Sequence, residues 1–125
     1  MVNTQYDDNN IFAKILRKEI PCKLVYEDDY VLSFHDIQPQ AAIHVLIIPK
    51  GRYVSFHEFH ATASEQEITG FYRAVSMIAE TLKLPESGYR LLSNHGKDAR
   101  QEVPHAHLHM IGGQDLGGML PRRNR

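Results

Sequence analysis

Three histidines alternate with apolar residues in the segment His105-Ala106-His107-Leu108-His109. In a β-strand, alternate side chains point to the same face and lie about 6.6 Å apart along the strand. A strand over 105–111 would therefore bring the three imidazoles onto one face, while Ala106 and Leu108 would point into the core. The chain has eight histidines in 125 residues, and we expect its chemistry at this cluster.

Such a row of imidazoles has three possible uses. It can be a solvated strand face without a role, although the apolar residues opposite the histidines speak against this. It can bind zinc through a His-x-His pair joined by His44 from a neighbouring strand. It can also attack phosphorus, because neutral imidazole is nucleophilic when its second nitrogen is held by an acceptor, and flanking imidazoles can bind phosphate or deliver a proton. The residues alone leave the zinc site and the catalytic site open.

The segments before the histidines predict the elements that must position them. We expect a short helix over 11–17 that begins at Asn10, a hairpin of strands over 23–26 and 30–35, and a buried strand over 44–48. A long helix should begin at the capping box formed by Ser64 and Glu67 and carry an apolar stripe as far as Leu82. Further strands over 89–93 and 105–111 flank a polar loop. This order is typical of an α+β domain with a mainly antiparallel sheet.

Composition excludes several classes of protein. The length of 125 residues, with 42% hydrophobic and 23% charged residues, fits a single domain. A formal net charge of -1 gives no basic field for nucleic acid or an anionic membrane. No apolar stretch approaches the roughly 20 residues that span a bilayer, and the first residues do not resemble a secretory signal. With Cys22 as the only cysteine, we expect a cytoplasmic protein without nucleic-acid or membrane partners.

The segment from Gln101 to Ile111 strongly resembles the signature of the histidine-triad (HIT) superfamily. Other segments resemble its Hint branch in the same order, namely those at 11–15, 19–21, 26–29, 33–37, 39–41 and 44–50. The resemblance implies an HIT-like fold, with a five-stranded, mainly antiparallel sheet, one long helix and one short helix. It divides the chain into a flexible N-terminal segment (1–10), the HIT domain (11–113) and a C-terminal tail (114–125).

The resemblance also implies a function. Hint-branch proteins are homodimers that bind purine nucleoside monophosphates and hydrolyse their phosphoramidates, without a metal or other cofactor. By this match, His107 would be the nucleophile that forms a nucleotidyl-histidine, and His105 would orient it, chiefly through its backbone carbonyl. His109 would contact the phosphate, and His44 would complete the row.

The implied nucleotide site lies in two parts of the chain. Its residues would be Phe12, Phe34, Asp36, Ile37, Asn94, Gln101 and Glu102. Asp36 would accept hydrogen bonds from the ribose hydroxyls, the three apolar residues would form the base pocket, and Asn94 and Gln101 would bind the sugar and phosphate. Glu102 stands where many animal relatives have a serine, so we expect it to offer its backbone N–H instead.

Two other classes of function remain. The same superfamily includes dinucleoside polyphosphate hydrolases and nucleotidyltransferases, which share the histidine chemistry. The chain can also be a non-enzymatic nucleotide- or zinc-binding module, although such a module would not require the central nucleophile.

Overall fold

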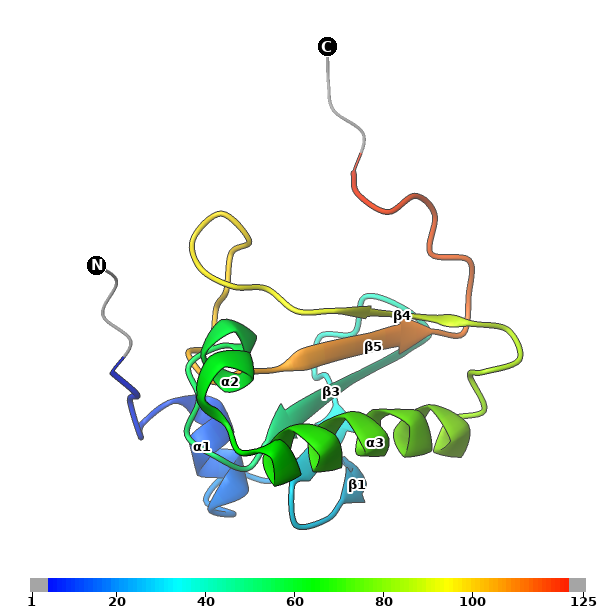
Figure 1. Ribbon diagram of the computed structural model, residues 1–125. Coiled ribbons are helices and arrows are strands. Elements are labelled where there is room, and N and C mark those ends of the chain that lie inside the picture. Colours follow the sequence, from blue (N-terminus) through cyan, green and yellow to red (C-terminus); the bar gives the residue numbers. More distant parts are fainter. Residues whose placement is uncertain (1–4, 122–125) are drawn as a thin grey trace.

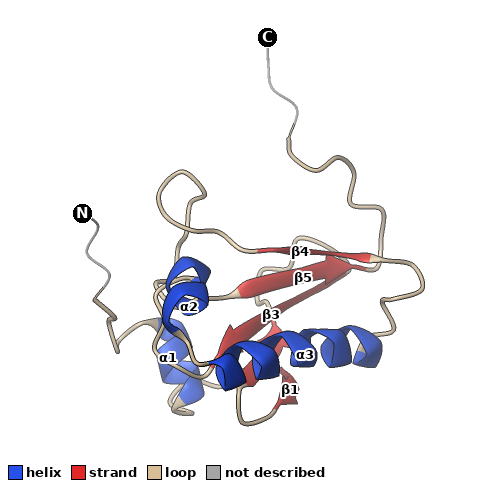
Figure 2. Ribbon diagram, in the orientation of Figure 1, coloured by secondary structure: helices blue, strands red, loops and turns tan. Residues whose placement is uncertain are grey.

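One antiparallel sheet runs through the protein (Figures 1 and 2). Its strands are β1 (Leu24–Glu27), β2 (Val31–His35), β3 (Ile43–Pro49), β4 (Tyr89–Leu92) and β5 (Leu108–Gly112), in the spatial order β1-β2-β3-β5-β4. The structure, a computed structural model, describes residues 5–121. Residues 1–4 of the expected N-terminal segment and 122–125 of the expected tail therefore lie outside the described residues. The predicted fold class is confirmed.

In the described part of the chain, three helices accompany the sheet: α1 (Ile11–Leu16), α2 (Phe56–Thr62) and α3 (Glu65–Thr81). Both predicted helix starts are present. The Asn10 side chain accepts the Ala13 N–H at 2.9 Å, and Ser64 and Glu67 form a reciprocal capping box. None of the helices within residues 5–121 is long and apolar enough to cross a membrane.

Helix α2 is an addition to the expected one long and one short helix. It has seven residues, of which only Phe56 and Phe59 are buried, so it is too short for helical periodicity to be visible in the sequence. A local signal was nevertheless there. Ser55 caps the helix and Glu58 follows three residues later, and the Glu58 carboxylate accepts the Val54 N–H at 2.7 Å.

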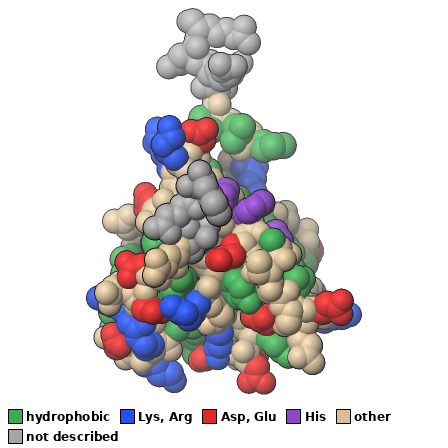
Figure 3. All heavy atoms as spheres, turned by 60° about the vertical axis from the view of Figure 1, so that its left-hand side comes forward, with side chains coloured by type: hydrophobic (Ala, Val, Ile, Leu, Met, Phe, Trp, Pro, Cys, Tyr) green, Lys and Arg blue, Asp and Glu red, His purple; other side chains and the backbone are tan. Residues whose placement is uncertain are grey.

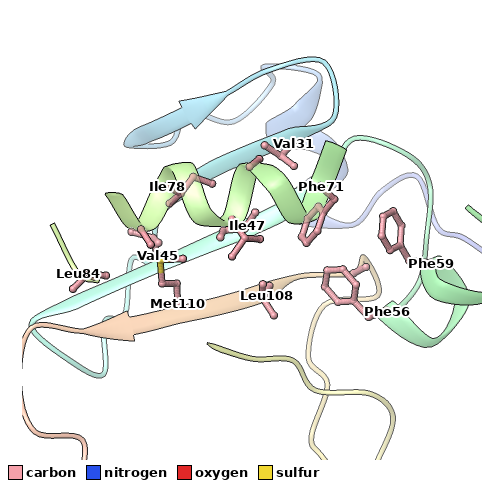
Figure 4. Close-up of a cluster of buried hydrophobic side chains, with 14 residues drawn as sticks. Val31, Val45, Ile47, Phe56, Phe59, Phe71, Ile78, Leu84, Leu108 and Met110 are labelled. Atoms are coloured by element: carbon pink, nitrogen blue, oxygen red, sulfur yellow. The ribbon is translucent and has the colours of Figure 1, made fainter. Parts of the chain in front are cut away.

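The two faces of the sheet carry separate apolar clusters, because successive strand residues point to opposite faces. Helices α2 and α3 cover one face (Figure 4), where the labelled side chains are Val31, Val45, Ile47, Phe56, Phe59, Phe71, Ile78, Leu84, Leu108 and Met110. Helix α1 covers the other face with a smaller cluster: Phe12, Ile15, Leu32, Phe34, Leu46 and Ile48. The second face also carries the histidines.

Candidate active site

Strands β3 and β5 bring two histidines together on the face covered by α1. Leu46 pairs with His109 and His44 with Ile111, so His44 and His109 are diagonal neighbours on one face. His44 Nε2 lies 2.9 Å from His109 Nδ1. The His107 ring lies 5.2 Å from that of His109, and the Phe12 ring of α1 meets His107 edge-on at 5.0 Å. The row that forms is therefore His44, His109 and His107.

His105 does not join this row, and the regular strand begins at Leu108 rather than at His105. The backbone groups that would extend the strand have other partners. The Ala106 N–H donates to the Tyr53 carbonyl at 2.8 Å, and the His105 carbonyl accepts a hydrogen bond from the His107 ring. The regular strand is therefore shorter than the predicted 105–111, although the predicted alternation persists, since the His105 ring also meets Phe12 of α1 edge-on, at 6.4 Å. The predicted burial of Ala106 and Leu108 is confirmed.

His107 has the geometry of a nucleophile. Its Nδ1 lies 2.7 Å from the His105 carbonyl oxygen. Because a carbonyl can only accept, Nδ1 carries the proton and Nε2 keeps its lone pair. Burial lowers the pKa of His107, against the opposing effects of the His105 carbonyl and of nearby carboxylates. The ring is therefore neutral at pH 7.

His105 is fixed in the interior from both sides of its ring. Its Nε2 lies 2.8 Å from the Pro49 carbonyl oxygen, and the Tyr6 hydroxyl lies 2.5 Å from its Nδ1. The residue has no exposed surface, and burial lowers its pKa to about 4. The side chain therefore anchors the segment, while its backbone carbonyl faces His107.

A chain of hydrogen bonds sets the protons of His44 and His109. The Gln40 backbone N–H donates to His44 Nδ1 at 3.0 Å, so in the neutral ring the proton of His44 lies on Nε2. That N–H faces His109 Nδ1 at 2.9 Å and Asp36 Oδ2 at 3.3 Å. The proton of His109 then lies on Nε2, which donates to no residue within 5–121. Burial, with smaller effects of the neighbouring histidines, lowers the pKa of His109 to about 4.

These hydrogen bonds decide whether the cluster fits a metal. Ligand atoms of Asp36, His44 and His109 lie within 4.8 Å of one another. A ligating histidine, however, gives its lone pair to the metal and donates its other N–H to an acceptor. At His44 the other nitrogen faces a donor, the Gln40 N–H, and both nitrogens of His105 are engaged within the protein. The donor set does not fit zinc, and this disfavours the metal interpretation of the histidines.

The expected nucleotide residues lie in two parts of the structure, near the imidazole row and in the loop that leads into the histidine segment. Asp36 lies beside the imidazole row, where its Oδ1 accepts the Gln38 N–H at 2.8 Å. Phe12 contacts the row directly, whereas Phe34 is buried behind it at 5.7 Å between ring centroids. Ile37 is 90% exposed. In the single chain it therefore lines no closed pocket.

The loop that enters the histidine segment is braced by Gln101. Its amide donates to the carbonyls of Val54 at 2.7 Å and Val103 at 3.0 Å, and its oxygen accepts the Gly96 N–H. Asn94 is half-buried and Glu102 is exposed. Gln101 therefore holds the loop together, and both N–H groups of its amide are used in these bonds.

Sequence reasoning missed several groups that hold the site. They are the Tyr6 hydroxyl, the Gln40 N–H, the Pro49 carbonyl and the Ser93 hydroxyl, which donates to the His107 carbonyl at 3.0 Å. Two of them are backbone groups, whose partners no residue type can reveal.

Figure 3 shows histidine side chains gathered at one place on the surface, while cationic and anionic side chains are interspersed below them.

Comparison with known proteins shows the family to which the chain belongs. Residues 17–116 match the model of the HIT domain, so the chain belongs to the HIT family, as its sequence predicted. It is 55% identical to an uncharacterized HIT-like protein of Azospirillum brasilense, over 94% of this chain and 96% of that protein. It is 41% identical to the purine nucleoside phosphoramidase of Escherichia coli K12, over 93% and 97%.

Solved structures show the same likeness. A HIT family hydrolase from Clostridium thermocellum superposes with a TM-score of 0.82 at 39% identity, over 92% of this chain and 99% of that one. A histidine triad nucleotide-binding protein from Candida albicans gives 0.79 at 35%, over 94% and 86%.

Proposed function

We propose that the protein hydrolyses the P–N bond of purine nucleoside 5′-phosphoramidates through a nucleotidyl-His107 intermediate. His107 Nε2 attacks the α-phosphorus, a bond forms between this nitrogen and phosphorus, and the P–N bond to the amine breaks as the amine takes up a proton from solvent and leaves. Water then attacks the same phosphorus and loses a proton to solvent, the bond between phosphorus and His107 Nε2 breaks, and the nucleoside monophosphate and neutral His107 are released. Splitting one displacement into two steps is the usual gain from covalent catalysis.

One observation carries this proposal: His107 Nδ1 is bound to the His105 carbonyl at 2.7 Å, with Nε2 left unprotonated in a ring whose pKa burial has lowered. A pure binding site would gain nothing from a neutral, oriented nucleophile. The Nε2–H of His109 is a donor for a phosphate oxygen, where it would stabilise charge that develops during attack. The similarity to the Escherichia coli phosphoramidase favours a P–N bond over the polyphosphate alternative.

The test measures release of a fluorescent amine from an adenosine phosphoramidate, with and without a chelator. Hydrolysis of a dinucleoside polyphosphate is measured in parallel for comparison. We expect turnover of the phosphoramidate that the chelator does not change. Faster turnover of the polyphosphate would overturn the substrate assignment in favour of the related hydrolases. No turnover of either, with nucleotide binding retained, would instead indicate a binding module.

The proposal places the ribose hydroxyls on Asp36. The carboxylate lies next to the row, and its Oδ2 has only a 3.3 Å contact with His44, so it can accept from a ligand. Changing Asp36 to Asn should weaken binding of adenosine monophosphate about tenfold, since a hydrogen bond to a charged group contributes about 1.5–3 kcal/mol. Calorimetry with the 2′,3′-dideoxy analogue is the control. An equal loss for both ligands would show that Asp36 acts elsewhere.

We also infer that the protein is a homodimer that associates through β4. This strand forms one edge of the sheet and pairs only with β5 among the described residues. Its Tyr89 and Leu91 are 37% and 41% exposed. An open, apolar edge strand favours pairing with a second chain. Light scattering should therefore give twice the chain mass of 14.3 kDa, and Leu91→Lys should shift the protein towards the monomer. A wild-type particle of the chain mass would refute this.

A further inference from the structure

The segment before α1 is fastened to the protein at several points. The Asn10 side chain caps α1 and donates to the Asp7 carbonyl at 2.8 Å. The Asp8 carboxylate accepts two hydrogen bonds from the Arg52 guanidinium, both at 2.9 Å. The same guanidinium lies over the Tyr6 ring, 5.1 Å from its centroid. These contacts hold Tyr6 against the body of the protein.

In this position Tyr6 contacts His105. The hydroxyl lies 2.5 Å from His105 Nδ1, and the two rings meet edge-on with their centroids 5.5 Å apart. The direction of this hydrogen bond follows from the other nitrogen. Because the Pro49 carbonyl must accept the Nε2 proton, Nδ1 of the neutral ring is an acceptor and the Tyr6 hydroxyl is its donor. No other donor to this nitrogen is present within residues 5–121.

The geometry points to Tyr6 as a positioning residue, which holds His105 so that the His105 carbonyl keeps the nucleophile His107 in place. The kinetic part of this inference rests on the proposed function. Tyr6 touches no reacting atom. It acts through one residue, whose side chain it binds and whose carbonyl lies 2.7 Å from His107 Nδ1.

Loss of the hydroxyl would leave a buried acceptor without a partner. A buried imidazole nitrogen without a donor is unfavourable, so the ring would rotate or admit water. Either response would move the carbonyl of the same residue, and small displacements of a nucleophile slow attack strongly. Burial raises the pKa of the Tyr6 hydroxyl, so the group keeps the proton that it donates.

A Tyr6→Phe variant isolates the hydroxyl, because phenylalanine keeps the ring contacts with His105 and Arg52. The matched control is Tyr26→Phe, which removes a hydroxyl that donates to the Asp28 carboxylate at 2.9 Å, away from the histidines. We expect kcat of Tyr6→Phe to fall about tenfold with KM unchanged, as for an interaction that matters in the transition state. Tyr26→Phe should keep both constants.

NMR of the histidine ring nitrogens tests the coupling from Tyr6 through His105 to His107 without measuring turnover. In the wild type, His105 Nδ1 should show the shift of a hydrogen-bonded acceptor, and the His107 Nδ1–H should exchange slowly. Tyr6→Phe should move the first resonance and speed the exchange of the second. If Tyr6→Phe does not fold, fluorotyrosine at position 6 keeps the shape and changes only the acidity of the hydroxyl, and it should shift the same nitrogen.

The two proposals fail separately. Absence of wild-type turnover refutes the phosphoramidase assignment, while the NMR comparison still decides the role of Tyr6. The positioning role of Tyr6 would be overturned if the His105 and His107 resonances were unchanged in Tyr6→Phe. A kinetic loss equal to that of Tyr26→Phe would overturn it as well.

Discussion

Changing His107 to Ala is expected to lower kcat for an adenosine phosphoramidate by at least about a hundredfold, since covalent routes rarely survive loss of the attacking group. The neighbouring imidazoles cannot replace it. His105 has both ring nitrogens bound within the protein, and His109 Nδ1 faces His44. Steady-state release of the amine measures the loss. Quenching in alkaline denaturant, in which a P–N bond to histidine survives, followed by mass spectrometry should find a nucleotidyl adduct on the wild type and none on the variant.

His60→Ala is the matched control for this experiment. His60 is exposed and contacts Tyr72 on the outer side of α2 and α3, so its removal tests the effect of losing an imidazole as such. We expect full turnover from this variant. Retention of nucleotide binding by His107→Ala would show that the folded site persists. Substantial turnover by His107→Ala would remove the central step of the proposed mechanism, and a different nucleophile would have to be sought.

The parts of the fold that were predictable are those with a local cause. Asn10 and Ser64 cap helices because their side chains can accept the free N–H groups of the next turn, and this requirement is visible in the sequence. The apolar run at 44–48 predicts a strand buried on both faces, and β3 packs on α3 with one face and on α1 with the other. Local patterns also predicted all five strands, but not their spatial order, which depends on pairing between distant segments.

The extent of the last strand was not predictable, because the argument from alternation assumes a regular strand over the whole segment. Regularity requires that backbone groups pair with the next strand. Here the His105 carbonyl pairs with the His107 side chain and the Ala106 N–H with a carbonyl in the loop before α2. The alternation of side chains persists, with Ala106 on the α3 face and His105 near Phe12 of α1, but the sequence does not show that the His105 side chain is fully buried.

Contacts between distant parts of the chain were also out of reach. Tyr6 and His105 are 99 residues apart in sequence, and nothing in a polar N-terminal segment marks one tyrosine as a partner of a buried histidine. Ile37 was expected in the base pocket, but its side chain is exposed. Its apolar character favours a pocket, but where such a side chain packs depends on the tertiary arrangement.

The buried histidines also make stability depend on pH, and we expect the free energy of unfolding to fall steeply between pH 6.5 and about 4. Burial lowers the pKa of His105 and His109 from 6.5 to about 4 in the folded protein. In this window the unfolded chain therefore binds protons that the folded protein does not, and acid favours unfolding. The contribution is complete above pH 6.5 and is lost as the pH falls towards 4.

The loss is large because each pKa unit corresponds to about 1.36 kcal/mol. For the fully buried His105, the shift amounts to about 3 kcal/mol on that scale, and the partly exposed His109 adds less because solvent screens it. His44 and His107, whose pKa values burial also lowers, act in the same direction.

Urea unfolding at several pH values between 7.5 and 4.8 measures this dependence. The carboxylates whose pKa values are lowered, among them Glu27 beside Lys50 and Glu67 in the capping box, lose their contribution only near and below their normal pKa of 4.5. The range above that value therefore reports on the histidines. His109→Asn should flatten the dependence, because asparagine does not titrate. A wild-type stability that stays constant from pH 6.5 to 4.8 would mean that these imidazoles take up protons in the folded state. The proposed mechanism requires a neutral His107, and it would then operate only near neutral pH.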